Sequence, residues 1–116
     1  GAARGIACDL DQDALTAPAL NAAENRVNIE LSQDLESALA VADLVTAADI
    51  LYDRENLPLL ARFQQANRVL LADSRVPDLD PPGYQLLGQW QSCTWPDLGE
   101  SNEYNGVRVF ASEPSP

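Results

Sequence analysis

Short apolar runs of the kind that form strands alternate with helix-like segments along most of this 116-residue chain. The apolar runs are too short for independent helices and are rich in Val, Ile, Leu and Ala. Strands are expected at residues 5–8, 26–32, 43–50 and 68–72, and helices at about 11–25, 34–41 and 55–66. Because parallel strands need crossover connections, which are usually helical, this alternation predicts a mostly parallel sheet covered on both faces.

The last part of the chain departs from this alternation. Residues 73–83 are rich in Asp, Pro and Gly, which predicts a loop. Residues 84–92 and 106–111 are expected to form an antiparallel strand pair joined by a long acidic loop. The predicted fold class is therefore α/β: a three-layer, mostly parallel, Rossmann-like sheet with a C-terminal antiparallel strand pair.

The composition excludes several classes of catalytic and binding site. All seven cationic side chains are Arg, and Lys and His are both absent. Without Lys there is no phosphate-binding loop of the G-x-x-x-x-G-K-[ST] type. Without His there is no His-based triad and no His-containing zinc site. Two cysteines, Cys8 and Cys93, are too few to close a zinc site, so no metal is expected.

The charge balance is strongly acidic, with seven cations against 18 Asp and Glu and a net charge of −11. Proteins that bind duplex DNA neutralise phosphates with Lys and Arg, so no nucleic-acid partner is expected. No apolar run approaches the roughly 20 residues of a membrane helix, and no leader-like segment is found, so the predicted location is the cytoplasm. Cys8 lies in an apolar run and is expected to be a buried, inert thiol.

Acidic residues follow each of the four predicted parallel strands. They lie in the segments Asp9–Asp11, Gln33–Leu35, Asp49–Tyr52 and Asp73–Arg75. The carboxyl ends of parallel strands share one edge of a sheet, where ligands of such folds bind. Asp is also common at helix caps and in turns, so a structural role is the competing interpretation for each position. A cluster of carboxylates would suit a ligand with hydroxyl groups and a positive centre.

Asp9 and Leu10 are the most specific local feature. A carboxylate at the end of a strand in a Rossmann unit can accept both ribose hydroxyls of a nucleoside. The apolar side chain of Leu10 could then lie against a purine, and Asp34 could accept from its exocyclic amine.

Three stretches of the chain, taken in order, resemble a known family. They are A-C-D-L-D-Q-D-A-L followed by L-N-A-A-E-N, then D-L-V-T-A-A-D-I-L-Y-D, then R-V-L-L-A-D-S-R. This order is similar to the class I, seven-strand S-adenosylmethionine-dependent methyltransferases. Asp49-Ile50-Leu51-Tyr52 is similar to the D-x-x-Y motif of the seven-strand lysine methyltransferases, a group that includes bacterial members related to nicotinamide methyltransferases.

The resemblance implies a cofactor, a reaction and roles for individual residues. S-adenosylmethionine would be held by Asp9 at the ribose and Leu10 at the adenine, with Asp34 and the adjacent Leu35 at the adenine amine. Asp49 and Tyr52 would line the place where methyl donor and acceptor meet. The acceptor would be an amine, with a protein lysine favoured, and the negative charge would attract such a cationic partner.

The resemblance also implies that the glycine-rich part of the family is missing. Only eight residues precede Asp9, whereas dinucleotide-type units place a glycine-rich turn about 20 residues before this acid. Residues 1–116 would then be a single partial domain that lacks the first strand, with weak or no cofactor binding and no activity alone. The gap could mean a fragment, an open sheet edge that a second copy fills, or direct pairing of the flanking strands.

Two other functions compete with methyl transfer. A phosphoacceptor receiver domain has similar size and acidity, but its chemistry uses a Lys that this chain lacks. A non-catalytic acidic interaction module with a Rossmann-like fold is the main alternative.

Overall fold

A computed structural model describes residues 1–99 and 105–113 of the chain. Part of the predicted acidic loop, residues 100–104, lies outside this description. The chain divides into two compact units, residues 1–41 and 42–116, and each is described by itself.

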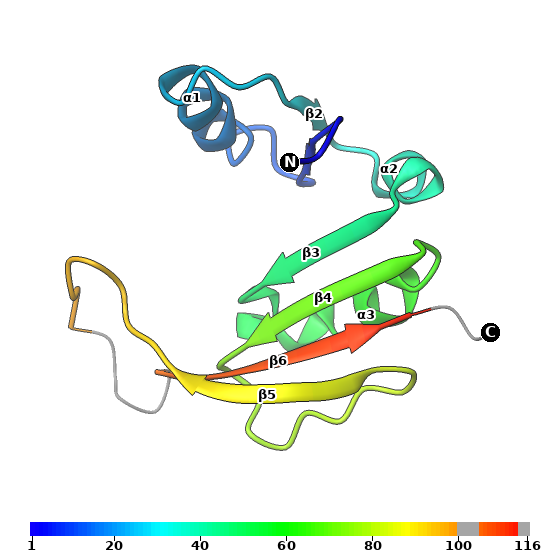
Figure 1. Ribbon diagram of the computed structural model, residues 1–116, viewed down its shortest axis with the longest axis vertical. Coiled ribbons are helices and arrows are strands. Elements are labelled where there is room, and N and C mark those ends of the chain that lie inside the picture. Colours follow the sequence, from blue (N-terminus) through cyan, green and yellow to red (C-terminus); the bar gives the residue numbers. More distant parts are fainter. Residues whose placement is uncertain (100–104, 114–116) are drawn as a thin grey trace. The chain divides into compact units, whose positions relative to one another are not determined.

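The first unit contains two short parallel strands and two helices (Figure 1). In order these are β1 (Ile6–Cys8), α1 (Thr16–Glu24), β2 (Glu30–Ser32) and α2 (Leu35–Val41). Ile6 pairs with Glu30 and Cys8 with Ser32, so the two strands end together. This is the strand–helix–strand–helix order that the sequence predicted.

Helix α1 begins later than the sequence predicted, and neither Asp11 nor Asp13 caps it. The Asp13 N–H donates to the Asp11 carboxylate instead, and the Asp11 N–H donates to Asp9, each at 2.9 Å. These bonds form successive turns before the helix. Pro18 is the third residue of α1, where its missing N–H would have no helical partner in any case.

The strand predicted at residues 26–32 is shorter than expected. Arg26 adopts a left-handed conformation with φ 55°, and its N–H donates to the carbonyl of Ala23 at the end of α1. The Val27 N–H donates to Ala22 in the same way. Arg26 and Val27 therefore belong to the end of α1 and not to the strand. The alternating pattern had predicted a buried face that includes Val27 and Leu31, but both side chains are exposed.

The second unit is built on a four-stranded sheet. Its elements are β3 (Leu44–Ala48), η1 (Ile50–Tyr52), η2 (Arg54–Asn56), α3 (Leu59–Phe63), β4 (Arg68–Asp73), β5 (Gln85–Gln91) and β6 (Gly106–Ser112). The strand order is β3-β4-β6-β5 (Figure 1). Strands β3 and β4 are parallel, and β6 is antiparallel to both β4 and β5. The predicted C-terminal antiparallel pair is therefore confirmed.

The helix predicted at residues 55–66 is interrupted. Pro58 stands at the N-cap of a five-residue α3, preceded by two separate 3-10 turns. Because the helix restarts after Pro58, its buried positions are Leu60 and Phe63, whereas Leu57 and Ala61 are exposed. The sequence pattern had predicted Leu57, Leu60 and Ala61 on the inward face, and of these only Leu60 is buried.

The chain is thus a mixed α/β, Rossmann-like fold, as the sequence predicted. Strands β1 and β3 belong to different sheets, one in each unit. Among the described residues, no helix is both long and apolar enough to cross a membrane.

Tyr84 provides a test of the second unit's packing. Its hydroxyl donates to the Leu60 carbonyl at 2.6 Å, and burial raises the pKa of Tyr84 to about 12. The unfolded chain would lose this proton near its ordinary pKa of about 10. Tyr84 therefore contributes stability that is intact below about pH 10 and is lost as the pH rises toward 12.

We expect Tyr84→Phe to lower the free energy of unfolding by about 1 kcal/mol at neutral pH, because a hydrogen bond is lost. Urea denaturation repeated near pH 11 should show a smaller alkaline loss in this variant than in the parent chain. Tyr52→Phe, at a residue that is 74% exposed, is the matched control and should keep the parent's pH dependence. Equal alkaline losses in the parent and Tyr84→Phe would contradict the assignment.

Candidate functional site

Asp9 lies directly after β1, and its N–H extends the parallel ladder by one residue. It donates to the Ser32 carbonyl at 3.0 Å. The Asp9 side chain is exposed, and its Oδ1 accepts from the Asp11 N–H at 2.9 Å. Within the described residues, Oδ2 of Asp9 has no hydrogen-bond partner, so one carboxylate oxygen is available to a ligand.

Leu10 presents an apolar side chain beside this carboxylate and is 82% exposed. Its carbonyl accepts from Nε2 of Gln33 at 2.9 Å, and Gln33 directly follows β2. The loops that follow the two strands are therefore joined by a side-chain hydrogen bond. Leu10 is in this way fixed by its backbone while its side chain stays open to solvent.

Asp34 follows β2 and its carboxylate is engaged by Ser37 in the first turn of α2. The Ser37 N–H donates to Oδ1 at 3.2 Å, and the Ser37 hydroxyl donates to Oδ2 at 2.5 Å. The Ser37 hydroxyl bond is the largest cause that lowers the pKa of Asp34, and the backbone bonds lower it further. This is the capping role that competed with cofactor binding. The adjacent Leu35 is half-buried.

Cys8 lies near enough to Asp9 and Asp34 for both charges to act on its thiol, and the expectation that it is a buried thiol was wrong. It is the last residue of β1 and is exposed. Partial desolvation raises the pKa of Cys8, and the negative charges of Asp9 and Asp34 raise it further. An apolar run of only three strand residues is too short to bury its final side chain.

Asp49 follows β3 in the second unit and is held in an uncommon backbone conformation. Its φ is 54°, in the left-handed region that non-glycine residues seldom occupy. Its N–H donates to the Ala72 carbonyl at 3.1 Å, and its Oδ1 accepts from the Ser74 hydroxyl at 3.0 Å. Asp49 is therefore tied to the end of β4 by both its backbone and its side chain.

Tyr52 closes the short η1 turn that follows Asp49, and its side chain is exposed rather than part of the core. Leu51, between the two, is 2% exposed and anchors the turn. Asn56 donates from Nδ2 to the Ile50 carbonyl at 2.8 Å, which stabilises the same segment. The second unit thus presents Asp49 and Tyr52 from one anchored segment.

Asp73, the fourth acidic strand end, does not face a ligand. It is 1% exposed, and its Oδ2 accepts from the Val76 N–H at 2.9 Å. The Arg108 guanidinium donates to the Val76 and Leu79 carbonyls. Asp73 and Arg108 therefore hold the loop that positions Ser74. Ser74 belongs to the segment predicted to follow this strand, but no role was assigned to it from the sequence, and Arg108 was missed.

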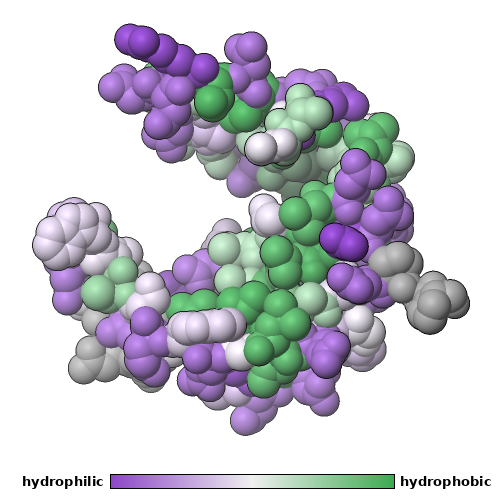
Figure 2. Space-filling model, in the orientation of Figure 1, coloured by the Kyte–Doolittle hydropathy of each residue, from purple (hydrophilic) through white to green (hydrophobic). Residues whose placement is uncertain are grey.

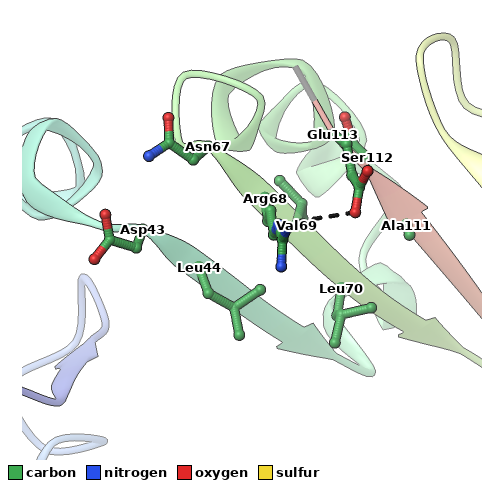
Figure 3. A pocket seen from close by; sticks show the side chains of 9 residues that line it. All are labelled: Asp43, Leu44, Asn67, Arg68, Val69, Leu70, Ala111, Ser112 and Glu113. Carbon is green, nitrogen blue, oxygen red and sulfur yellow. Dashed lines mark ion pairs between the residues drawn. The ribbon is translucent and has the colours of Figure 1, made fainter. Parts of the chain in front are cut away.

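One groove of the second unit lies away from Asp49 and Tyr52. Its volume is about 400 Å³, and it is at the amino ends of β3 and β4 (Figure 3). Arg68 and Glu113 form an ion pair of 3.8 Å beside it. Since ligands of parallel sheets bind at the carboxyl ends of the strands, this groove is not the candidate site.

The sequence-predicted residues therefore form two clusters. Asp9, Leu10 and Asp34 gather at the carboxyl ends of β1 and β2, with Leu35 next in the chain. Asp49 and Tyr52 follow β3, with Ser74 hydrogen-bonded to Asp49. The clusters belong to different units of the chain and are described separately.

No protein-family model matches this sequence, and a search of curated proteins also finds no match. Solved structures with a similar fold are found, however. One is Sp1610 of Streptococcus pneumoniae, named for a proposed tRNA (m1A22) methyltransferase activity. It is 12% identical, with a TM-score of 0.55 over 97% of this chain and 55% of that chain. Another is TehB of Haemophilus influenzae, 9% identical, with a TM-score of 0.56 over 96% of this chain and 50% of that chain.

At these identities the likeness shows the fold alone. The chain has a Rossmann-like fold of the kind found in S-adenosylmethionine-dependent methyltransferases. It spans about half the length of the solved structures that it matches.

The hydrogen bonds of Ser37 give a prediction for Asp34. Because the folded pKa of Asp34 lies below its ordinary value, its contribution to stability is present above that value and is lost as the pH falls through the folded pKa. Ser37→Ala removes the hydroxyl donor, so the pKa of Asp34 should rise toward the ordinary range. An NMR titration of the Asp34 carboxyl carbon measures this shift.

Ser74→Ala is the matched control for that titration, because its hydroxyl donates to Asp49 in the other unit. It should leave the titration of Asp34 unchanged. An unchanged Asp34 in the Ser37→Ala variant would show that the hydroxyl bond is absent in solution.

Proposed function

We propose that these 116 residues are part of an S-adenosylmethionine-dependent methyltransferase that transfers a methyl group to an amine, with a protein lysine the favoured acceptor. The observation that supports this most is the placement of Asp9 and Asp34 at the adjacent ends of two parallel strands in a fold shared with methyltransferases. S-adenosylmethionine, when bound, supplies an electrophilic methyl group on a positively charged sulfur.

The first cluster fits the nucleoside part of this cofactor in its residue types. The free oxygen of Asp9 can accept from a ribose hydroxyl, and the exposed Leu10 offers an apolar surface for a purine face. Asp34 keeps a lone pair on each oxygen after its bonds to Ser37, and these can accept from an exocyclic amine. Leu35 would complete the apolar contact.

The described residues do not supply the close backbone contact that a glycine-rich turn gives a cofactor. We therefore propose that this chain is a single partial domain, lacks the first strand of the family, and binds cofactor weakly and without turnover by itself. The cytoplasm stays the predicted location, on the sequence alone.

The second cluster would act on the acceptor. Ser74 occupies Oδ1 of Asp49, which leaves Oδ2 to accept a hydrogen bond from an amine. A carboxylate next to an amine raises the amine's pKa, whereas the amine must be neutral to attack a methyl group. Asp49 is therefore proposed to orient the acceptor and not to act as a strong base, and the exposed hydroxyl of Tyr52 would be a second polar contact.

The charge of the chain supports a cationic acceptor rather than RNA. A net charge of −11 and the absence of Lys favour approach of a positively charged protein. The same charge would repel the phosphate backbone of RNA, which proteins bind mainly through Lys and Arg side chains. The tRNA activity named for Sp1610 is thus not proposed for this chain.

An NMR titration of the chain with S-adenosylhomocysteine tests the first cluster. We expect the amide signals of Asp9, Leu10 and residues 33–35 to shift, with saturation only at millimolar ligand. Asp9→Asn removes the charge that favours a hydroxyl donor and should weaken the binding about tenfold, or about 1.4 kcal/mol. Asp13→Asn, in the turn that follows, is the matched control and should not change it.

The outcomes separate the parts of the proposal. Shifts confined to other residues, or equal affinity in the two variants, would contradict the assigned cofactor site. Micromolar binding measured by calorimetry would overturn the proposed need for a glycine-rich turn while supporting the cofactor class. Tighter binding of ATP than of S-adenosylhomocysteine would favour a phosphate-binding function instead.

A further inference from the structure

The loop that follows β5 leaves the sheet at the same edge as Asp49 and Tyr52. Strand β6 is antiparallel to both β4 and β5, so β5 runs in the direction of β4 and β3. The arrowheads of these three strands point to one edge of the sheet (Figure 1). Strand β5 is the outer strand at the other end of the sheet from β3, so a strand added beside β3 would not reach it.

Residues 94–99 of this loop form a turn, the 94–99 turn, whose backbone is held by local hydrogen bonds. The Leu98 N–H donates to the Thr94 hydroxyl at 3.2 Å, and the Gly99 N–H donates to Oδ1 of Asp97 at 2.9 Å. Within the described part of the chain, Oδ2 of Asp97 has no hydrogen-bond partner. The turn therefore keeps its shape by itself and leaves one carboxylate oxygen open to a ligand.

The 94–99 turn exposes two large apolar side chains. Trp95 is 97% exposed and Leu98 is 75% exposed, and Figure 2 shows pale and green surface on this loop, at the left of the second unit. Trp90 differs, because its indole lies against Gly88, where a Cβ atom would come within 2.8 Å of the ring. The fold thus uses Trp90 for packing but not Trp95, and exposed apolar clusters that include tryptophan are typical of protein–protein contacts.

The chain around this turn carries only negative charge. No cationic residue lies between Arg75 and Arg108, and the acidic residues of that interval are Asp78, Asp80, Asp97, Glu100 and Glu103. The face of an exposed aromatic ring attracts cations, and a carboxylate on the same turn adds to this attraction. Arginine fits better than lysine, because its planar guanidinium can stack on an indole and also donate to a carboxylate.

We propose that the 94–99 turn binds arginine side chains that flank the methylated lysine of the acceptor protein. The guanidinium would stack on the Trp95 indole and donate to Oδ2 of Asp97, while the apolar part of the arginine side chain covers Leu98. The inference rests on the proposed function for the identity of this partner. The binding itself involves neither cofactor nor methyl transfer, so it can be measured without them.

Quenching of tryptophan fluorescence by acrylamide first tests whether the Trp95 indole is exposed in solution. The chain has two tryptophans, so Trp90→Phe leaves Trp95 as the sole emitter and Trp95→Phe leaves Trp90. We expect stronger quenching of Trp95, because Trp90 is partly covered by its own strand. Quenching of Trp95 no stronger than that of Trp90 would mean that another part of the chain covers the turn, and would overturn the inference.

Fluorescence anisotropy of a labelled peptide measures the binding to the 116-residue chain. The peptide carries one lysine flanked on both sides by arginine and glycine. One variant has norleucine in place of the lysine, and another has citrulline in place of each arginine. We expect equal binding of the lysine and norleucine peptides. The citrulline peptide should bind at least about fivefold more weakly, because citrulline keeps the shape of arginine without its charge.

Substitutions in the chain locate the contact. Trp95→Leu keeps an apolar side chain but removes the aromatic face, and should weaken binding of the arginine peptide about fivefold. Asp97→Asn keeps an acceptor for the Gly99 N–H and should weaken binding about threefold. Asp43→Asn is the matched control, because it removes one exposed negative charge at the amino end of β3, on the opposite edge of the sheet. It should cause a smaller loss than Asp97→Asn. Circular dichroism verifies that each variant is folded.

Three binding results would contradict the inference. They are no binding of the arginine peptide, unchanged affinity in Trp95→Leu, and equal losses in Asp97→Asn and Asp43→Asn. Equal binding of the citrulline peptide would also overturn it, since the turn would then take an apolar partner. The proposed function can fail separately: docking of the norleucine peptide at Trp95, with no shift of Asp9 by S-adenosylhomocysteine, would support the docking site and contradict the methyltransferase assignment.

Discussion

Parallel pairing of short strands is the constraint on which the arrangement of this chain depends. A parallel ladder makes neighbouring strands end together, so the residues after them meet in space although 23 or more positions separate them in sequence. Two side-chain hydrogen bonds join residues that follow neighbouring strands. Gln33 donates to Leu10 in one unit, and Ser74 donates to Asp49 in the other. Without the ladder, none of these polar groups would be neighbours.

The carboxylates at the strand ends accept hydrogen bonds from nearby N–H and hydroxyl groups of the chain, without any ligand. Asp34 is engaged by Ser37 on both oxygens, and the buried Asp73 accepts from the turn that follows it. Asp9 and Asp49 each commit one oxygen to a local donor. Local bonds of this kind fix the direction of a carboxylate, because one committed oxygen also orients the other. The same interactions therefore give the loops their shape, and they leave one exposed oxygen each of Asp9 and Asp49 without a hydrogen-bond partner among the described residues.

The sheet of the second unit is mixed, with one parallel and two antiparallel pairings. Its outer strands carry exposed apolar side chains, among them Leu44 on β3 and Leu86 and Trp90 on β5. Burial is concentrated on the two central strands, β4 and β6, at Val69, Leu71 and Phe110.

The sequence by itself determined the α/β class, the order of the elements and the antiparallel C-terminal pair, because periodicity and turn residues are local signals. Only the tertiary structure decided which apolar or acidic residues are buried. Cys8 ends a strand too short to cover it, and Pro58 restarts a helix and shifts its buried face. Asp73 lies in the core because its strand's phase turns it inward, next to Leu71 in the alternation. Burial depends on what packs against each side chain, and no local pattern carries that information.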